Sequence, residues 1–274
     1  MSYETLKLSI DQKIAHVSLN RPDALNAFNM QLFHDLKTVF SDINHRSDVR
    51  VIVLSGEGKH FTAGLDLKEA AGELFDNSPG DAGRKREKFR RKVKHLQDCI
   101  SAVDQCRVPV IVAVHGACIG AGMDLIAGCD IRILANDAYC TVQEINVGLV
   151  ADIGSLQRLP DLLPGGILRE LAYTARKLKA DEALRLGFAN HVADDRAAAI
   201  EHALEIAATI AAKTPLAITG LKDVMNYQRD HSVQEGLDYV GLWNTGMLQG
   251  EDTLKAVQAT LTKQAASFDD LMED

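Results

Sequence analysis

Two runs of apolar, mostly β-branched residues constrain the fold most strongly. They are VRVIVLSG at 49–56 and VPVIVAVHG at 108–116. Neither run alternates polar and apolar residues, so neither fits a strand with one face in water. A continuous run of this length is typical of a strand that helices cover on both faces, as in parallel sheets. The two runs therefore predict an α/β fold with a buried sheet.

Other segments complete this pattern. Residues 26–44 place apolar side chains at helical spacing, with Asn26 as a candidate N-cap. Further strands are expected at 5–10, 13–20, 129–135 and 138–144. After about residue 155 the pattern is mainly helical, and only FANHV at 188–192 interrupts it. Amphipathic helices are expected at 195–213, 216–229, 232–247 and 251–266. We therefore expect a core of residues 1–200, with the functional site, followed by a helical region of residues 201–274.

Composition narrows the class of partner. The chain has 274 residues, 46% of them hydrophobic, so it can bury a sizeable core. Its formal net charge of −8 argues against a nucleic-acid-binding protein, which usually presents a basic surface. The expected partner is therefore a small molecule, with neither nucleic acid nor a membrane.

Cysteine usage and the two ends of the sequence indicate a cytoplasmic protein. The five cysteines form no C-x-x-C pair and lie at no metal-ligand spacing from a histidine, so we expect reduced thiols in the core. The N-terminal residues lack the apolar centre of a signal peptide, and no stretch of about 18 apolar residues exists to span a bilayer. The final LMED does not match a peroxisomal signal.

A polar loop and a basic run lie between the two buried strands. GELFDNSPGDAG at 72–83 has the composition of a mobile surface loop. RKREKFRRKVK at 84–94 follows it directly and is strongly basic. A solvated helix face is the simpler interpretation. The alternative is that the run attracts a polyanionic ligand such as a phosphorylated cofactor.

Two glycine-containing turns share one pattern. SGEGKHFTAGLDL at 55–67 and HGACIGAGMDL at 115–125 each follow a buried strand and lead towards a helix. A helix start has unpaired N–H groups and the positive end of the helix dipole, so two such turns together could bind an oxyanion. The candidate donors are the N–H groups of Leu65 and Ala121. The alternatives are close helix–strand packing, which glycine permits, and phosphate binding, although the P-loop Lys-Ser/Thr is missing.

Three acidic residues interrupt stretches that otherwise look buried. They are Asp124, Glu144 and Asp152. A buried carboxylate is costly unless it is hydrogen-bonded, partly solvated or protonated. Each acid taken alone could be a helix cap or half of an ion pair, and Asp124 could cap its own helix. Taken together, they suggest a proton-transfer site in which apolar walls raise carboxylate pKa values towards neutrality.

The combined motifs resemble one family. HFTAGLDL, HGACIGAGMDLIAGCDIRI and EINVGLVADIGSLQRLP are similar to the corresponding segments of the crotonase (enoyl-CoA hydratase/isomerase) superfamily, and the resemblance extends over almost the whole chain. It implies an α/β spiral of β-β-α units with a C-terminal helical trimerisation region. It also implies an acyl-CoA thioester substrate and a homotrimer or a dimer of trimers, with no metal and no cofactor beyond the coenzyme A of the substrate.

The three acids indicate which reaction to expect within that superfamily. Hydratases usually have glutamate at the positions of Asp124 and Glu144 and glycine at that of Asp152. The Asp, Glu, Asp set is instead similar to the members that isomerise 3,5-dienoyl-CoA to 2,4-dienoyl-CoA in fatty-acid β-oxidation. An enoyl-CoA hydratase is the alternative. A non-catalytic acyl-CoA- or RNA-binding relative is less compatible with three intact acids.

The resemblance also assigns a role to each residue. Glu144 is expected to remove a proton from C2, and Asp152 to deliver one to C6, because one carboxylate could hardly reach both carbons. Asp124 is expected to position or tune Glu144. The thioester oxygen is expected between the N–H groups of Leu65 and Ala121. The residues expected to line the thioester and acyl site are Ala63, Gly64, Leu65, Asp66, Leu67 and Gly122.

Overall fold

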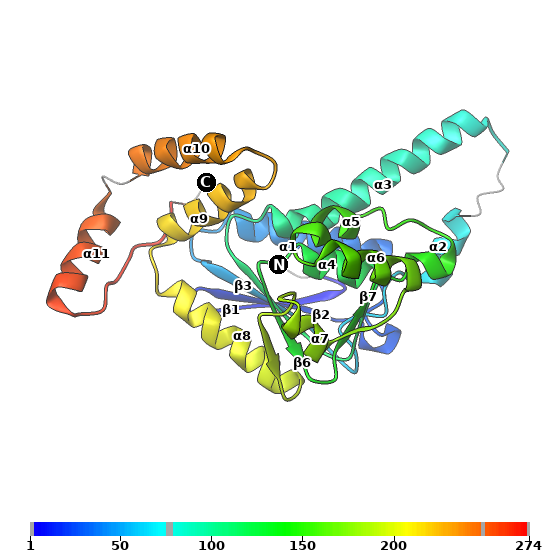
Figure 1. Cartoon of the computed structure of the whole chain (residues 1–274), viewed down its shortest axis with the longest axis horizontal. Coiled ribbons are helices and arrows are strands. Elements are labelled where there is room, and N and C mark those ends of the chain that lie inside the picture. The colour runs from blue at the N-terminus through cyan, green and yellow to red at the C-terminus, as the bar shows by residue number, and fades with distance from the viewer. Residues whose placement is uncertain (1–2, 75–78, 248–249, 273–274) are drawn as a thin grey trace.

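A mixed six-stranded sheet forms the centre of the computed structural model, which describes residues 3–74, 79–247 and 250–272 (Figure 1). The strands lie in the order β1-β2-β3-β4-β6-β9. β1 and β2 are antiparallel, and every later pair in the sheet is parallel. The bounds are β1 Leu6–Asp11, β2 Ile14–Leu19, β3 Val51–Gly56, β4 Val110–Val114, β6 Ile131–Ala135 and β9 His191–Ala193.

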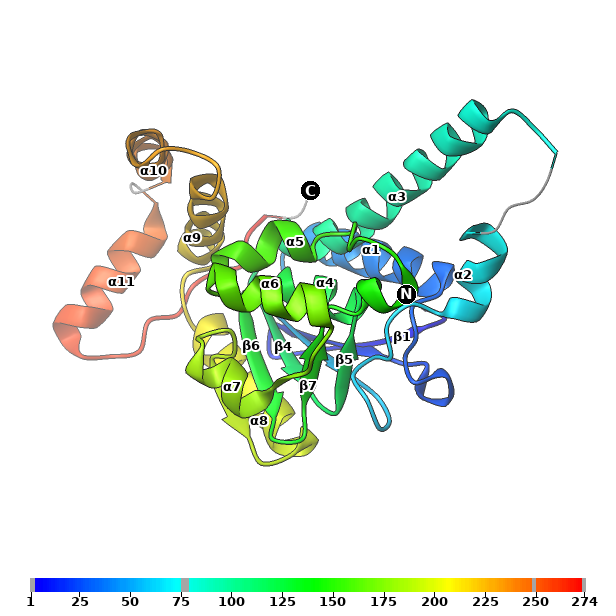
Figure 2. The same cartoon turned by 45° about the vertical axis from the view of Figure 1, so that its right-hand side comes forward.

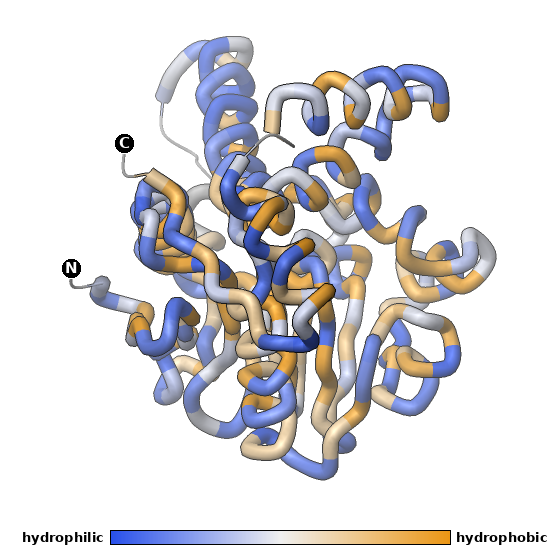
Figure 3. Tube along the Cα trace, turned by 90° about the vertical axis from the view of Figure 1, so that its left-hand side faces the viewer, coloured by the Kyte–Doolittle hydropathy of each residue, from blue (hydrophilic) through white to orange (hydrophobic). Residues whose placement is uncertain are grey.

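The two runs that define the sheet are buried on both faces, as predicted. In β3, Val51 and Val53 pack in the cluster formed with helix α8 (Arg196–Ala211), whereas Ile52 and Leu54 pack in the larger cluster on the opposite face. β4 divides its side chains in the same way. Helix α8 packs against the sheet through a stripe of alanines at 199, 203, 207 and 211. Figure 3 shows the hydrophobic residues gathered along these central strands.

A second, three-stranded sheet positions the second glycine turn. Its order is β5 (Ala117–Ile119), β7 (Tyr139–Thr141) and β8 (Leu178–Lys179). β5 and β7 are parallel and place Ile119 opposite Thr141. β8 was not predicted, because two residues give no detectable periodicity. β5 leads directly into α4 (Ala121–Ala127).

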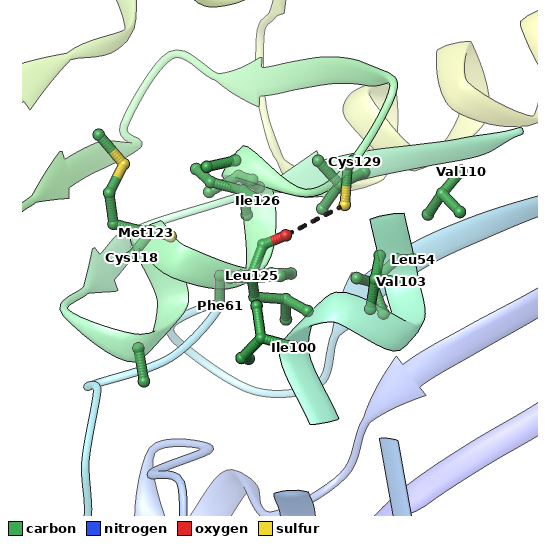
Figure 4. Close-up of a cluster of buried hydrophobic side chains, with 14 of the residues drawn as sticks. Leu54, Phe61, Ile100, Val103, Val110, Cys118, Met123, Leu125, Ile126 and Cys129 are labelled. Carbon is green, nitrogen blue, oxygen red and sulfur yellow. Dashed lines mark hydrogen bonds between the residues drawn. The ribbon is translucent and has the colours of Figure 1, made fainter. Parts of the chain in front are cut away.

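Helix α4 is wholly buried. Figure 4 shows Met123, Leu125 and Ile126 of this helix among Phe61, Ile100 and Val103. Such a helix excludes water along its whole length, so the carboxylate of Asp124 within it needs protein partners.

The start of helix α1 differs from the prediction. Helix α1 begins at Met30, and its N-cap is Asn29, which accepts a hydrogen bond from Leu32 N. The prediction of Asn26 as N-cap was therefore wrong: Asn26 is buried, with φ of +53°, in the turn before the helix. The other bounds are α1 Met30–Asn44, α2 Leu67–Leu74, α3 Ala82–Asp104, α5 Ser155–Arg158, α6 Gly165–Thr174, α7 Ala180–Arg185, α9 Pro215–Gln228, α10 Val233–Met247 and α11 Glu251–Thr262, with 3-10 turns at Pro22–Ala24, Glu144–Val147 and Leu159–Asp161.

Helices α9, α10 and α11 project from the core, on the side opposite to α2 (Figures 1 and 2). The boundary predicted after residue 200 falls inside α8, and the packing of the core continues to Ala211. The chain after α11 returns to the sheet, where Arg50 donates hydrogen bonds to Phe268 O and to the Asp270 carboxylate.

The polar loop and basic run meet at the start of α3. Of the loop predicted at 72–83, residues 72–74 belong to α2, residues 75–78 lie outside the described part of the chain, and Asp81 caps α3. The basic run occupies the first half of α3, where the side chains of Arg84 and Arg91 are mainly exposed. Among the described helices no single one is long and apolar enough to cross a membrane, although α8 and α9, bent by 109°, pass that test as a pair.

Candidate active site

The two glycine turns lie side by side. Thr62 and Cys118 form an isolated parallel bridge. Thr62 N donates to Ala117 O at 3.0 Å, and Ile119 N donates to Thr62 O at 3.2 Å. The two segments therefore run from the bridge in the same direction. Leu65 lies three residues after Thr62, and Ala121 lies three residues after Cys118. This pairing brings the two predicted oxyanion donors to equivalent positions of adjacent segments.

The N–H groups of Leu65 and Ala121 are available to a ligand. Neither has a hydrogen-bond acceptor among the residues that the structure describes. The preceding N–H groups are both used: Gly64 N donates to Thr62 Oγ1 at 3.1 Å, and Gly120 N donates to Thr141 O at 3.0 Å. Gly64 and Gly120 have φ of +86° and +51°, a region that glycine adopts without steric cost. The arrangement can stabilise negative charge on a bound oxygen.

Asn26 and Thr62 hold the first turn in place, and no site role was predicted for either. Asn26 Nδ2 donates to Glu57 O at 2.8 Å and to His60 O at 3.0 Å. Thr62 Oγ1 donates to Asn26 O at 2.7 Å. Both residues are fully buried. The sequence contained no signal for these roles, because Asn26 lies 34 residues before His60 and their contact depends on the tertiary structure.

Asp124 is fully buried in α4 and does not cap that helix, whose N-cap is Gly120. Its Oδ1 accepts hydrogen bonds from Ser155 N, at 2.5 Å, and from Ser155 Oγ. Its Oδ2 is buried and has no partner among the described residues. Burial, opposed by the bonds from Ser155 and reinforced by the charge of Glu144, raises the pKa of Asp124 to about 7.

Glu144 lies beside the second glycine turn. The β5–β7 pairing ends at Ile119 and Thr141, so Gly120 and Glu144 emerge from neighbouring strands. A methyl group added to Gly120 would lie 3.1 Å from Glu144 Oε1, so glycine leaves room for this carboxylate. Glu144 Oε2 is buried without a partner in the described ranges. Burial raises the pKa of Glu144, and the charge of Asp152 acts in the same direction.

Asp152 completes the group of acids. It lies between the 3-10 turn at Glu144–Val147 and α5, and Gln97 Nε2 of α3 donates to its backbone oxygen at 2.7 Å. Asp152 is exposed, as are residues 145–150 before it, so the expectation that this stretch is buried was wrong. Partial burial of its carboxyl group nevertheless raises the pKa of Asp152. The charges of Glu144 and Asp152 both raise the pKa of Asp124, so the three predicted acids form one electrostatic cluster.

An apolar cavity of about 310 Å³ connects the first turn with Asp152. Leu65 and Asp66 line one part of it, and Leu149, Val150 and Asp152 line another. The remaining wall comes from α1, α2 and α3, including Phe33, Phe89, Val93 and Leu96. A larger cavity of about 680 Å³, with many charged residues, lies between α5 and α9 and also includes Asp152 in its lining. Asp152 therefore lies between an apolar and a polar space.

Only some of the predicted substrate-binding residues line the apolar cavity. Leu65 and Asp66 line the apolar cavity, and Asp66 also pairs with Arg21 at 3.5 Å. Ala63 and Gly64 belong to the first turn, whereas Leu67 begins α2 and is 53% exposed, outside the cavity lining. A methyl group on Gly122 would lie 2.3 Å from Thr62 Cγ2. Gly122 thus permits close packing of α4 against the first turn, and its contact with an acyl group stays a prediction.

Comparison with known proteins identifies the family. Residues 9–270 match the model of the family described as enoyl-CoA hydratase/isomerase. The chain belongs to this family. Relatives of the enoyl-CoA hydratase/isomerase family with high similarity include two proteins named mitochondrial delta(3,5)-delta(2,4)-dienoyl-CoA isomerase. The mouse protein is 42% identical over 96% of this chain and 81% of its own length, and the human protein is 44% identical over 94% and 80%.

Solved structures of this family have the same fold. An enoyl-CoA hydratase from Bacillus anthracis has a TM-score of 0.88 and 29% identity, with 97% of this chain and 99% of that chain covered. The enoyl-CoA hydratase of Mycobacterium smegmatis has a TM-score of 0.86 and 27% identity, with 96% and 98% covered. The predicted α/β fold of the family is thereby confirmed.

Proposed function

We propose that this protein isomerises 3,5-dienoyl-CoA thioesters to 2,4-dienoyl-CoA thioesters. The observation that supports this most directly is Asp152, a third acid beside Asp124 and Glu144 that also lines the apolar cavity next to Leu65. The relatives named dienoyl-CoA isomerase are 42–44% identical to the chain, whereas a Bacillus subtilis protein named probable enoyl-CoA hydratase is 29% identical. The position of Asp152 and the higher identity to the named isomerases both favour isomerisation over hydration.

The proposed reaction removes a proton from C2 and adds one at C6, which is four carbon–carbon bonds away. Loss of a proton from C2 gives an enolate that is conjugated with both double bonds of the diene, and its negative charge is centred on the thioester oxygen. Addition of a proton at C6 then leaves double bonds at C2 and C4. No atom is gained or lost overall, so the reaction needs a base, an acid and an oxyanion site. In the proposal all three come from the protein, and coenzyme A is part of the substrate.

The oxyanion is assigned to the N–H groups of Leu65 and Ala121. They point to no acceptor in the described chain, and Ala121 N lies at the start of a helix, where the dipole also favours negative charge. Such donors stabilise the transition state without reorganisation because the turns already hold them in position. Gly64 and Gly120 provide the backbone conformation that this requires.

Glu144 is assigned as the base at C2 and Asp152 as the acid at C6. Glu144 lies beside Gly120, next to the proposed oxyanion donor Ala121, and therefore near the carbon atoms adjacent to the thioester. Asp152 lies at the apolar cavity, which has room for the rest of the acyl chain. Raised pKa values suit both roles: they strengthen Glu144 as a base and keep Asp152 protonated at higher pH.

A hydratase is the second candidate. Asp124 Oδ2 and Glu144 Oε2 are both buried without partners among the described residues, and a water molecule between the two carboxyls could satisfy both. Hydration of a 2-enoyl-CoA would use that water as the nucleophile. This reaction leaves Asp152 without a role.

An ultraviolet assay with two substrates separates these candidates. With 3,5-octadienoyl-CoA, we expect the purified protein to form the conjugated 2,4-diene. With crotonyl-CoA, we expect much slower loss of the enoyl absorbance. Hydration of crotonyl-CoA without diene formation would refute the isomerase and support the hydratase.

The protein is also proposed to form a homotrimer or a dimer of trimers. Helices α9, α10 and α11 project from the core and expose large apolar side chains, among them Leu237 (58%), Leu242 (75%) and Leu254 (71%). Apolar surface of this extent usually indicates an interface. Light scattering after gel filtration should give three or six times the chain mass of 29.8 kDa. A monomer at micromolar concentration would contradict this assignment.

The cytoplasmic location stays a prediction. By their names, the mouse and human relatives are mitochondrial and the Arabidopsis thaliana relative is peroxisomal. Fractionation of the source cells with an antibody to the protein would test it.

A further inference from the structure

Ser155 is the residue to which Asp124 is bound. It donates twice to the same oxygen, Oδ1, from its backbone nitrogen at 2.5 Å and from its hydroxyl. Both residues are fully buried. Oδ2 of Asp124 has no partner in the described part of the chain. Because one residue occupies Oδ1 twice, Oδ2 is the oxygen that stays available to the other groups of the site.

The position of Ser155 in the chain connects two of the acids. It is the first residue of α5 and lies three residues after Asp152. Gly154, with φ of +141°, makes the turn between them, a conformation that glycine adopts far more readily than other residues. The hydrogen bonds to Asp124 therefore join the segment that contains Asp152 to α4, which follows the second glycine turn.

We propose that Ser155 is a positioning residue, whose hydroxyl fixes the Asp124 carboxyl and the Asp152 segment relative to each other. This inference rests on the proposed isomerase function for its catalytic consequence. The geometry itself does not depend on that function. Loss of the hydroxyl would leave Oδ1 with one donor, the Ser155 backbone nitrogen, and would remove one of the two hydrogen bonds between Ser155 and Asp124.

The charges around Asp124 determine the direction of the expected change. Glu144, Asp152 and the buried thiol of Cys118 all interact electrostatically with this carboxyl, and charge on either of the two acids raises its pKa. The two hydrogen bonds from Ser155 lower the pKa of Asp124, because they stabilise the ionised carboxylate. Without the hydroxyl, the pKa of Asp124 should rise above its value of about 7. The carboxyl would then ionise only at higher pH.

The test compares Ser155→Ala with the wild type by two measurements. The first is a ¹³C NMR titration of the carboxyl groups, with the Asp124 signal assigned by its absence in Asp124→Asn. We expect the titration midpoint of Asp124 to rise by about one unit in Ser155→Ala, as for loss of one hydrogen bond to a charged group. The second is the pH dependence of kcat for 3,5-octadienoyl-CoA. We expect its inflection near neutral pH to shift upwards, with kcat about tenfold lower and KM little changed.

Controls separate positioning from a merely structural role. Ser155→Thr keeps a hydroxyl and should return the titration midpoint towards the wild-type value. Ser41→Ala, at an exposed position of α1, should change nothing. Ser155→Cys, which replaces the hydroxyl by a slightly larger thiol that is a weak donor, provides the same test should the alanine variant fail to fold. A folded Ser155→Ala or Ser155→Cys with the wild-type titration midpoint would overturn the inference.

Failure of the function and failure of the inference give different results. Wild-type protein that forms no 2,4-diene would refute the isomerase, while the NMR titration would still test the contact between Ser155 and Asp124. Active wild-type protein together with an unshifted Ser155→Ala profile would refute the inference alone.

Discussion

Glu144→Gln is expected to lower kcat for 3,5-octadienoyl-CoA by about 10³-fold, within the range of about 10²–10⁴ typical of general acid–base catalysis. Glutamine has nearly the same shape as glutamate but cannot accept a proton from C2. The oxyanion donors are main-chain groups and remain, so binding of the thioester should persist. The measurement is the initial rate of 2,4-diene formation, followed by ultraviolet absorbance.

Two further measurements make this result specific to the base. Calorimetric titration with octanoyl-CoA, which has no diene to isomerise, should give a Kd within a few-fold of the wild-type value. The matched control is Glu201→Gln, at an exposed position of α8, which should keep wild-type turnover. Wild-type turnover in Glu144→Gln would remove Glu144 from the mechanism.

Asp152→Asn is expected to slow the same reaction by about 10²-fold or more, because asparagine cannot give a proton to C6. Removal of the C2 proton by Glu144 does not need Asp152. The variant should therefore still exchange the C2 hydrogen of the substrate with D₂O, although it forms little 2,4-diene. Proton NMR of the substrate in D₂O measures this exchange directly.

The Asp152 variant separates two mechanisms. If one carboxylate both removes and returns the proton, Asp152→Asn should keep near-normal turnover, which would leave Asp152 with a structural role only. Asp194→Asn, at an exposed position before α8, is the matched control.

In wild-type protein with two separate acids, product made in D₂O should contain deuterium at C6, since the carboxyl proton of Asp152 exchanges with solvent.

Local sequence was sufficient for the main elements of the fold. The runs at 49–56 and 108–116 are apolar throughout, and the structure places their alternate residues on the two covered faces of the sheet. Local patterns were less informative about the N-cap of a helix when more than one suitable residue precedes it. Asn26 and Asn29 both precede a helix-like pattern, and the tertiary hydrogen bonds of Asn26 to Glu57 O and His60 O decided between them.

The residues of the candidate site were proposed from the sequence, but the sequence did not contain their geometry. Asp124, Glu144 and Asp152 were recognisable because ionisable groups are costly in apolar surroundings. Their proximity depends on the pairing of Ile119 with Thr141 and on the contact between Asp124 and Ser155, which spans 31 residues. Ser155 itself gave no signal, because a serine at the start of a helix is common for local reasons.

The sequence by itself determined which segments form buried strands and helices, where glycine permits a turn, and which acids were candidates for a site. These are local properties, fixed by side-chain polarity and backbone sterics over a few residues. Only the tertiary structure decided that Leu65 and Ala121, on adjacent segments, present N–H groups without an acceptor among the described residues, and that Ser155 binds Asp124. Such contacts join residues far apart in the chain, so they depend on strand pairing and packing, which local patterns do not contain.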